Sequence, residues 1–167
     1  PELIYFVRRD LLKESVPPIH DLWDLPGLQR ILRHQNADGS FACSGKQSVS
    51  YPVHYYPLVE TWKQIRFLID QYGTTRKHEP TEKACEYLFS CQTPAGDIRG
   101  FLGDQYATYY TGAILSLLIR AGYKDDPRVH KAFQWLLDMR QSDGGWTIPI
   151  LTVKLGRKEQ YAAMTTP

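Results

Sequence analysis

Long hydrophobic runs and an excess of one charge sign are both missing from this sequence. The longest apolar stretch, Ala113–Ile119, is interrupted by Ser116, whereas a helix that crosses a membrane needs about 20 apolar residues. The 20 Lys and Arg residues nearly balance the 18 Asp and Glu residues and are spread along the chain. We therefore expect no membrane span, and no nucleic acid as a partner.

Cysteine is scarce, and its spacing excludes two classes of small fold. Cys43, Cys85 and Cys91 form no CxxC pair, and their odd number argues against a disulfide framework and a zinc knuckle. The five histidines show no spacing typical of metal ligands. The first residues lack a secretory signal pattern. We therefore predict a cytoplasmic protein with reduced thiols, no metal and no cofactor.

Common catalytic signatures are absent as well. The sequence contains no GxSxG, Walker loop, GxGxxG or HExxH. An acidic cluster near a loop, His20-Asp21 with Asp24, leaves a glycosidase on an α/α barrel open. The acidic pair Asp125-Asp126 stands before Pro127, which is the arrangement of a helix N-cap. We interpret this pair as structural.

Hydrophobic periodicity predicts an all-α fold. Apolar residues recur at helical spacing, and Gly or Pro separates the segments. The segment 106–121 is apolar nearly all round, so we expect an inner helix that is buried on two sides. Amphipathic helices on either side of it suit an outer layer. The predicted helices cover residues 3–14, 27–35, 58–72, 81–92, 106–121 and 128–141.

Three of these helices end in one pattern: a glutamine, a turn with Gly and Asp, then an aromatic or apolar residue. The glutamines are Gln35, Gln92 and Gln141, which lie 57 and 49 residues apart. This period predicts stacked helical hairpins, because a single hairpin cannot bury its apolar face. We predict one α/α-repeat domain over residues 1–167. Phe41 and Trp146, which close two of the turns, should be buried against the helices before them.

The third copy, Trp135–Trp146, resembles the Gln-Trp repeat of the squalene cyclase and protein-prenyltransferase β-subunit superfamily. Residues 111–118 resemble the inner helix of that family, and the resemblance covers residues 24–148. It implies an α/α toroid around a cavity, which in several members is apolar and binds an isoprenoid. Three hairpins would be part of a toroid, so we also expect self-association that completes the ring.

The residues that carry chemistry in this superfamily have no match here. Triterpene cyclases use an Asp-x-Asp-Asp acid, which does not occur in the sequence. Prenyltransferase β-subunits hold zinc through an Asp-x-Cys loop, and no Asp stands two residues before Cys43. We predict that this chain alone binds no zinc and transfers no prenyl group. Three functions stay open: a protein that binds an apolar or isoprenoid ligand, a fragment of a terpenoid cyclase-like enzyme whose acid lies elsewhere, and a protein-binding repeat scaffold.

Tyrosines gather at matching places before two inner helices, in residues 48–56 and 103–110. A tyrosine ring offers apolar contact, and its face stabilises a cation. A helix N-terminus also attracts an anionic group such as a diphosphate. The alternative is that these tyrosines pack between hairpins. We predict that the mouth of a cavity is lined by His54, Tyr55, Asp104, Tyr106, Tyr109 and Tyr110, with His54 and Asp104 as acid or base candidates.

Overall fold

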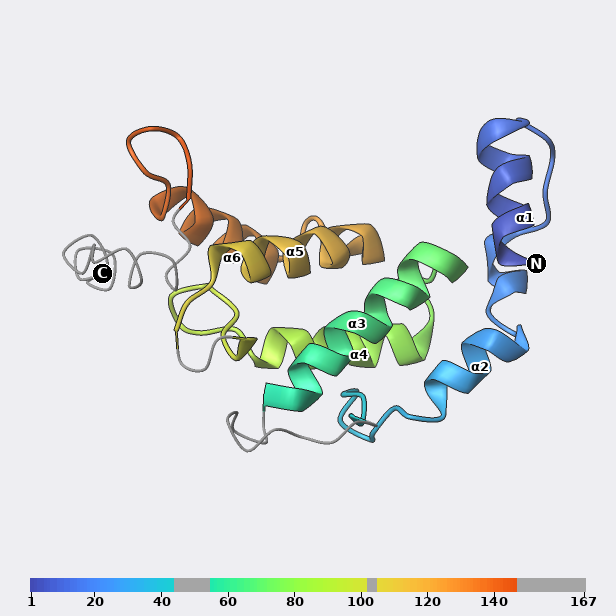
Figure 1. Cartoon of the computed structure of the whole chain (residues 1–167), viewed down its shortest axis with the longest axis horizontal. Helices are drawn as coiled ribbons and strands as arrows, with labels where there is room; N and C mark the ends of the chain where they lie inside the picture. The colour runs from blue at the N-terminus through green and yellow to red at the C-terminus, as the bar shows by residue number, and fades with distance from the viewer. Residues whose placement is uncertain (44–54, 102–104, 147–167) are drawn as a thin grey trace.

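The structure, a computed structural model, describes residues 1–43, 55–101 and 105–146, and it is all-α, as predicted (Figure 1). Each helix lies where the periodicity predicts it, and its ends differ by at most three residues from the prediction when the turn Val7–Leu11 is counted with the first helix, whose regular α-helical part ends at Phe6. None of the described helices is long and apolar enough to span a membrane. The α-helices are α1 (Glu2–Phe6), α2 (Pro26–Leu32), α3 (Tyr55–Tyr72), α4 (Glu79–Ser90), α5 (Thr108–Leu118) and α6 (Pro127–Asp138). Shorter helical turns cover Val7–Leu11, Ile19–Leu22 and Ile119–Tyr123.

Local sequence signals set the helix ends. Gly73, with φ 59°, ends α3 in the left-handed conformation that a helix C-terminus favours. Proline occupies the first turn of α2, α4 and α6, where its missing N–H costs nothing. At α6 the carboxylate of Asp126 also accepts the N–H of Arg128 at 2.8 Å. This bond confirms the interpretation of Asp126 as an N-cap.

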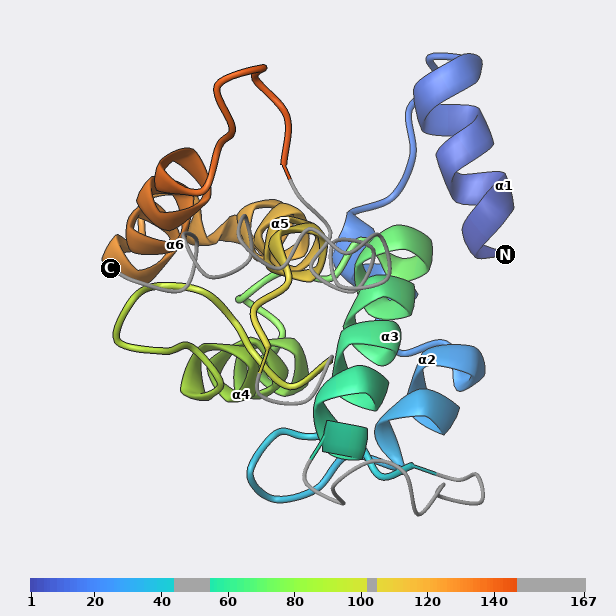
Figure 2. The same cartoon turned by 60° about the vertical axis from the view of Figure 1, so that its left-hand side comes forward.

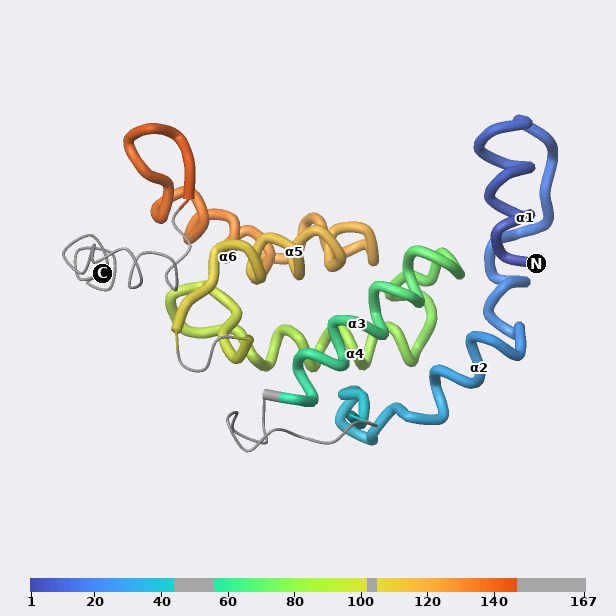
Figure 3. Tube along the Cα trace, viewed as in Figure 1, coloured from blue at the N-terminus to red at the C-terminus, as the bar shows by residue number. Residues whose placement is uncertain are grey.

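The helices form two layers, and each antiparallel pair has one helix in the inner layer and one in the outer layer. The pairs are α3 with α4 and α5 with α6, and α3 also contacts α5 and α2. Figure 2 shows α3 and α5 inside a row of outer helices formed by α2, α4 and α6. The Cα trace runs from α1 at the right to α6 at the left, so successive pairs lie side by side (Figure 3).

The core lies between the two layers. Helix α5 is buried on more than one side, as predicted, because Ile114 and Leu118 are fully buried and Leu115 is 2% exposed. Helix α3 contributes Ile65 and Leu68, both at 0% exposure. The two inner helices therefore carry much of the core.

Candidate functional site

The first two turns are each tied to the next outer helix by their glutamine. Gln35 Nε2 donates to a glycine carbonyl of its own turn at 3.1 Å and to Pro80 O, at the start of α4, at 2.7 Å. Gln92 Nε2 does the same, donating within its turn at 2.8 Å and to Arg128 O, at the start of α6, at 2.9 Å. Each glutamine therefore joins one hairpin to the next.

The residue that closes each of these turns is held by the inner helix that follows. The Phe41 N–H donates to Thr61 Oγ1 at 2.9 Å, and the Ile98 N–H donates to Thr111 Oγ1 at 3.2 Å. Both threonines and Phe41 are 0% exposed, and Ile98 is 1% exposed. Phe41 is thus buried, as predicted, but it is held by the helix that follows its turn rather than by the one before it.

The third turn repeats the backbone bonds of the first with a shift of one residue from the predicted alignment. The Gly144 N–H donates to Gln141 O, as the Gly39 N–H donates to Asn36 O. Gln141 therefore corresponds to Asn36, and its alignment with Gln35 is wrong. Arg140 takes the glutamine's place, because its Nε donates to Gly144 O at 2.9 Å.

Trp146 is not buried, so that prediction is wrong. Its indole folds back on its own helix and donates to Leu136 O at 2.7 Å, but 47% of the residue is exposed. Phe41 is covered by the inner helix that follows its turn, whereas no helix follows Trp146 within the described residues.

The predicted cavity-mouth residues fall into different surroundings. His54 and Asp104 lie outside the described residues, and Tyr55 begins α3 without a described side chain. Tyr106 is 4% exposed and meets Trp135 of α6 edge to face, with ring centroids 6.0 Å apart.

The two tyrosines that open α5 belong to an aromatic cluster, which we define as Trp62, Phe101, Tyr109 and Tyr110. Tyr110 stacks on Phe101 with centroids 4.2 Å apart. Trp62 meets both rings edge to face, at 5.6 and 6.1 Å. Tyr109 is 66% exposed and packs beside Tyr110 at 4.9 Å. Phe101 was not among the predicted residues, although its position just before the second loop was a usable signal.

The exposed side of α3 and α5 is aromatic at one end and charged at the other. The guanidinium of Arg66 lies 5.4 Å from the centroid of Trp62 and 5.8 Å from that of Phe67. Towards the other end, Arg120 of the turn that extends α5 pairs with Asp70 of α3. The aromatic cluster thus lies near the start of α5 and an ion pair near its end.

Two hollows flank the hairpins. One, of about 280 Å³, lies between α5 and α6 and is mainly apolar. Its lining residues are Gly112, Leu115, Ser116, Ile119, Arg120, Phe133 and Leu136. The other, of about 410 Å³, is more polar and lies between α2 and α3. It is lined by Gly27, Arg30, Ile31, His34, Ala42, Glu60, Gln64 and Tyr72.

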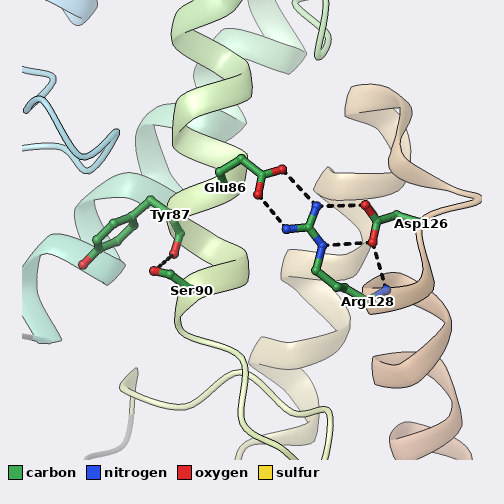
Figure 4. A network of polar contacts seen from close by, with 5 residues as sticks. All are labelled: Glu86, Tyr87, Ser90, Asp126 and Arg128. Atoms are coloured by element: carbon green, nitrogen blue, oxygen red, sulfur yellow. Dashed lines mark hydrogen bonds and ion pairs between the residues drawn. The ribbon is translucent and has the colours of Figure 1, made fainter.

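A charged network joins α4 to α6 (Figure 4). Arg128 pairs with Asp126 at 2.8 Å and with Glu86 at 2.6 Å, and its guanidinium lies 3.7 Å from the ring centroid of Phe89. The hydrogen bond from Arg128 lowers the pKa of the Asp126 carboxyl. An ionised cap is unsuited to donating a proton, so this carboxyl is structural.

Cysteine and metal chemistry find little support in the described residues. Burial raises the pKa of the Cys85 thiol to about 12, which leaves it protonated and unreactive. All three cysteines are free. Within residues 1–43, 55–101 and 105–146, no three His, Cys, Asp or Glu side chains gather as metal ligands would.

Comparison with known proteins identifies relatives. The family model of the squalene-hopene cyclase C-terminal domain matches residues 56–152. A squalene–hopene cyclase from Bradyrhizobium diazoefficiens is 26% identical over 145 residues, covering 79% of this chain and 22% of that protein. A protein named as a probable squalene–hopene cyclase, from Sinorhizobium fredii, is 25% identical over 134 residues, covering 72% of this chain and 21% of that protein. The chain thus spans about a fifth of the length of these relatives.

A solved structure supports the fold. A crystal structure of a protein from Actinoplanes matches with a TM-score of 0.50 and 18% identity, covering 74% of this chain and 35% of that one. The resemblance to the squalene cyclase superfamily is confirmed by the family match.

Proposed function

Because this chain belongs to the family of the squalene-hopene cyclase C-terminal domain, we propose that it forms one arc of the wall of an α/α toroid that holds an isoprenoid hydrocarbon. The proposal treats residues 1–167 as a single repeat domain of a cytoplasmic protein, in keeping with its three free cysteines. The observation that carries it is the aromatic cluster at the start of α5, where Tyr109 is 66% exposed beside the stacked pair Phe101 and Tyr110.

The cluster suits an apolar, cation-forming ligand. Tyr109 and Phe67 expose 66% and 39% of their surface, and both lie on inner helices. Aromatic faces bury hydrocarbon and attract positive charge. In this proposal Tyr109 and Tyr110 contact the ligand, and Tyr106 supports the wall from behind through Trp135.

His54, Tyr55 and Asp104 extend the proposed mouth on sequence grounds. A role in chemistry is a second candidate, in which the chain is a fragment of a cyclase whose acid lies elsewhere. The buried carboxylate of Asp97 pairs with Arg99, two residues away, at 2.7 Å. This pairing within one turn favours a structural role for Asp97, so the catalytic acid of such an enzyme would come from another part of the protein.

Ligand binding tests the proposal. Farnesyl diphosphate would be titrated into the purified chain while tryptophan fluorescence is recorded, with inorganic diphosphate as the head-group control. Tyr109→Ala should weaken binding about tenfold, which corresponds to the loss of roughly 1.4 kcal/mol of aromatic contact. Phe133→Ala, which changes an exposed ring on the outer helix α6, should leave the affinity unchanged.

Three outcomes would contradict the proposal. The first is that farnesyl diphosphate does not bind, which would favour a protein-binding scaffold. The second is that inorganic diphosphate binds equally well. The third is that Phe133→Ala weakens binding while Tyr109→Ala does not, which would move the ligand to the hollow between α5 and α6.

A further inference from the structure

The hollow between α2 and α3, which we call the α2–α3 hollow, is lined by one face of each helix. Gly27, Arg30 and His34 come from α2 and the turn after it, at the spacing of a single helix face. Helix α3 contributes Gln64 and, two turns later, Tyr72. The volume of about 410 Å³ lies in the range of sites for small organic molecules. The α2–α3 hollow shares no lining residue with the aromatic cluster, so it is a separate place on the molecule.

A largely buried hydroxyl opens into this hollow. Tyr72 is 4% exposed, and its hydroxyl makes no hydrogen bond to the residues that the structure describes. Burial raises the pKa of this phenol, so at neutral pH the hydroxyl keeps its proton and is a donor. A donor in such surroundings needs an acceptor, and for Tyr72 the acceptor has to come from the contents of the hollow.

The space for this hydroxyl depends on a glycine. A Cβ at Gly27 would overlap the Tyr72 hydroxyl. Gly27 lies in the first turn of α2, and glycine is less favourable than alanine in a helix. The glycine therefore costs helix stability but lets the hydroxyl reach the hollow.

Two basic side chains stand beside the hydroxyl. Arg30 and His34 line the hollow and are exposed, and neither forms an ion pair with any of the residues that the structure describes. The positive charge of Arg30 opposes the rise in the pKa of Tyr72, as expected of a guanidinium near the hydroxyl. Donors from two helices thus converge on one hollow, which favours an anionic ligand.

Glu60 decides between kinds of anion. Its carboxylate also lines the hollow, where it accepts Gln64 Nε2 at 2.6 Å and pairs with Lys63 at 3.6 Å. A fixed carboxylate repels a phosphate dianion more strongly than it repels a carboxylate with a single charge. The planar fork of Arg30 also matches a carboxylate. The two oxygens of Glu60 retain capacity to accept a hydroxyl of the ligand.

We propose that the α2–α3 hollow binds a small hydroxy carboxylate, whose carboxylate contacts Arg30 and the Tyr72 hydroxyl and whose own hydroxyl donates to Glu60. His34 lies beside this position as a further donor, and Ile31 gives the hollow an apolar wall for a short carbon skeleton. This inference does not depend on the isoprenoid ligand proposed for the aromatic cluster.

Titration followed by NMR tests the proposal. Lactate, mandelate and phenyllactate carry the same two groups on carbon skeletons of increasing size, and each would be added to the chain while the Gly27 amide is followed. At least one of them should shift this amide. Arg30→Gln should weaken its binding more than about tenfold, because charge-assisted hydrogen bonds are lost. Arg33→Gln removes an exposed arginine that does not line the hollow, and it should leave the affinity unchanged.

Tyr72→Phe separates binding from folding. The hydroxyl is bonded to none of the described residues, so its removal should leave the urea midpoint of unfolding unchanged. The same variant should bind the hydroxy carboxylate about tenfold more weakly, as the loss of one hydrogen bond implies. Mandelamide, in which a neutral amide replaces the carboxylate, should not bind.

The proposal is wrong if none of the three hydroxy carboxylates binds, or if mandelamide binds as tightly as mandelate. Equal effects of Arg30→Gln and Arg33→Gln on the affinity would also overturn it. Tighter binding of inorganic phosphate than of any of the three carboxylates would reject the carboxylate in favour of a phosphate ligand. Each of these results leaves the test of the isoprenoid proposal unaffected, because that test reads out variants of other residues.

Discussion

Gln92 joins its hairpin to the next one: its side-chain amide donates to the backbone carbonyl of Arg128, at the start of α6, at 2.9 Å. The same amide closes its own turn through the Gly96 carbonyl at 2.8 Å. One half-buried side chain thus fixes both the turn and its distance from α6. Gln35 makes the matching pair of bonds to Gly39 and Pro80.

Gln92→Leu should therefore destabilise the protein by roughly 2–3 kcal/mol, because two hydrogen bonds are lost and two carbonyls are left unpaired. Urea denaturation measures the free energy of unfolding. Gln134→Leu is the control, since its exposed amide bonds to Asp138 on the same helix, and its effect should stay within about 0.5 kcal/mol. Equal effects of the two variants would contradict a structural role for Gln92.

Asp126 should make the protein less stable in acid. Its pKa in the folded state lies below the ordinary value of 3.8, chiefly because Arg128 donates to it. A lowered pKa contributes stability above the unfolded-state value, and that stability is lost as pH falls through the folded-state value. The free energy of unfolding should thus decline below about pH 4.

Asp126→Asn checks the assignment, because it removes the titrating group and keeps a side chain that can cap α6. Urea denaturation of both proteins from neutral pH into acid should show a shallower decline in the variant. Parallel declines would place the acid sensitivity at other carboxyls.

The sequence predicted the fold through hydrophobic periodicity and through the Gly and Pro residues that separate the helices, which are local properties. Leu28 and Leu88 recur on helix faces, and Gly73 ends α3 as expected. What it did not predict depends on neighbours. Trp146 and Phe41 occupy the same place in their turns, yet only Phe41 is covered, because burial depends on the helix that packs next.

The candidate site was only partly predictable for the same reason. Tyr106, Tyr109 and Tyr110 are close in sequence, but one is buried, one is exposed and one is half-buried. Their helical phase and the ring of Phe101, which stacks on Tyr110, decide between these environments. Arg140 was missed because the glutamine beside it matches the expected residue type.

Phe41→Ala should cost about 3–5 kcal/mol of unfolding free energy, since the ring is fully buried and its removal leaves a cavity. Tyr109→Ala should cost less than about 1 kcal/mol, because 66% of the residue is already exposed. Chemical denaturation compares the two. A large loss for Tyr109→Ala would mean that this residue supports the fold, and its use as a ligand-contact variant would fail.

Two glycines should respond in opposite directions to alanine. Gly39 has φ +87°, and a Cβ there would overlap the Lys83 carbonyl oxygen on α4, so Gly39→Ala forces the turn away from the next hairpin. Gly112 lies within α5, and a Cβ there would meet Leu136 Cδ1 at 3.9 Å, an ordinary contact. Gly112→Ala should therefore stabilise the protein by about 0.5–1 kcal/mol, because alanine loses less backbone entropy in a helix.

Thermal and urea denaturation of both glycine variants would measure these effects. Gly39→Ala should lower the free energy of unfolding by more than about 1 kcal/mol, since strain at a positive φ adds to the backbone clash. A neutral Gly39→Ala variant would show that the first turn does not pack closely on α4. That result would also weaken the correspondence between the first two turns, because the close approach of Gly96 to the Lys131 carbonyl follows the same geometry.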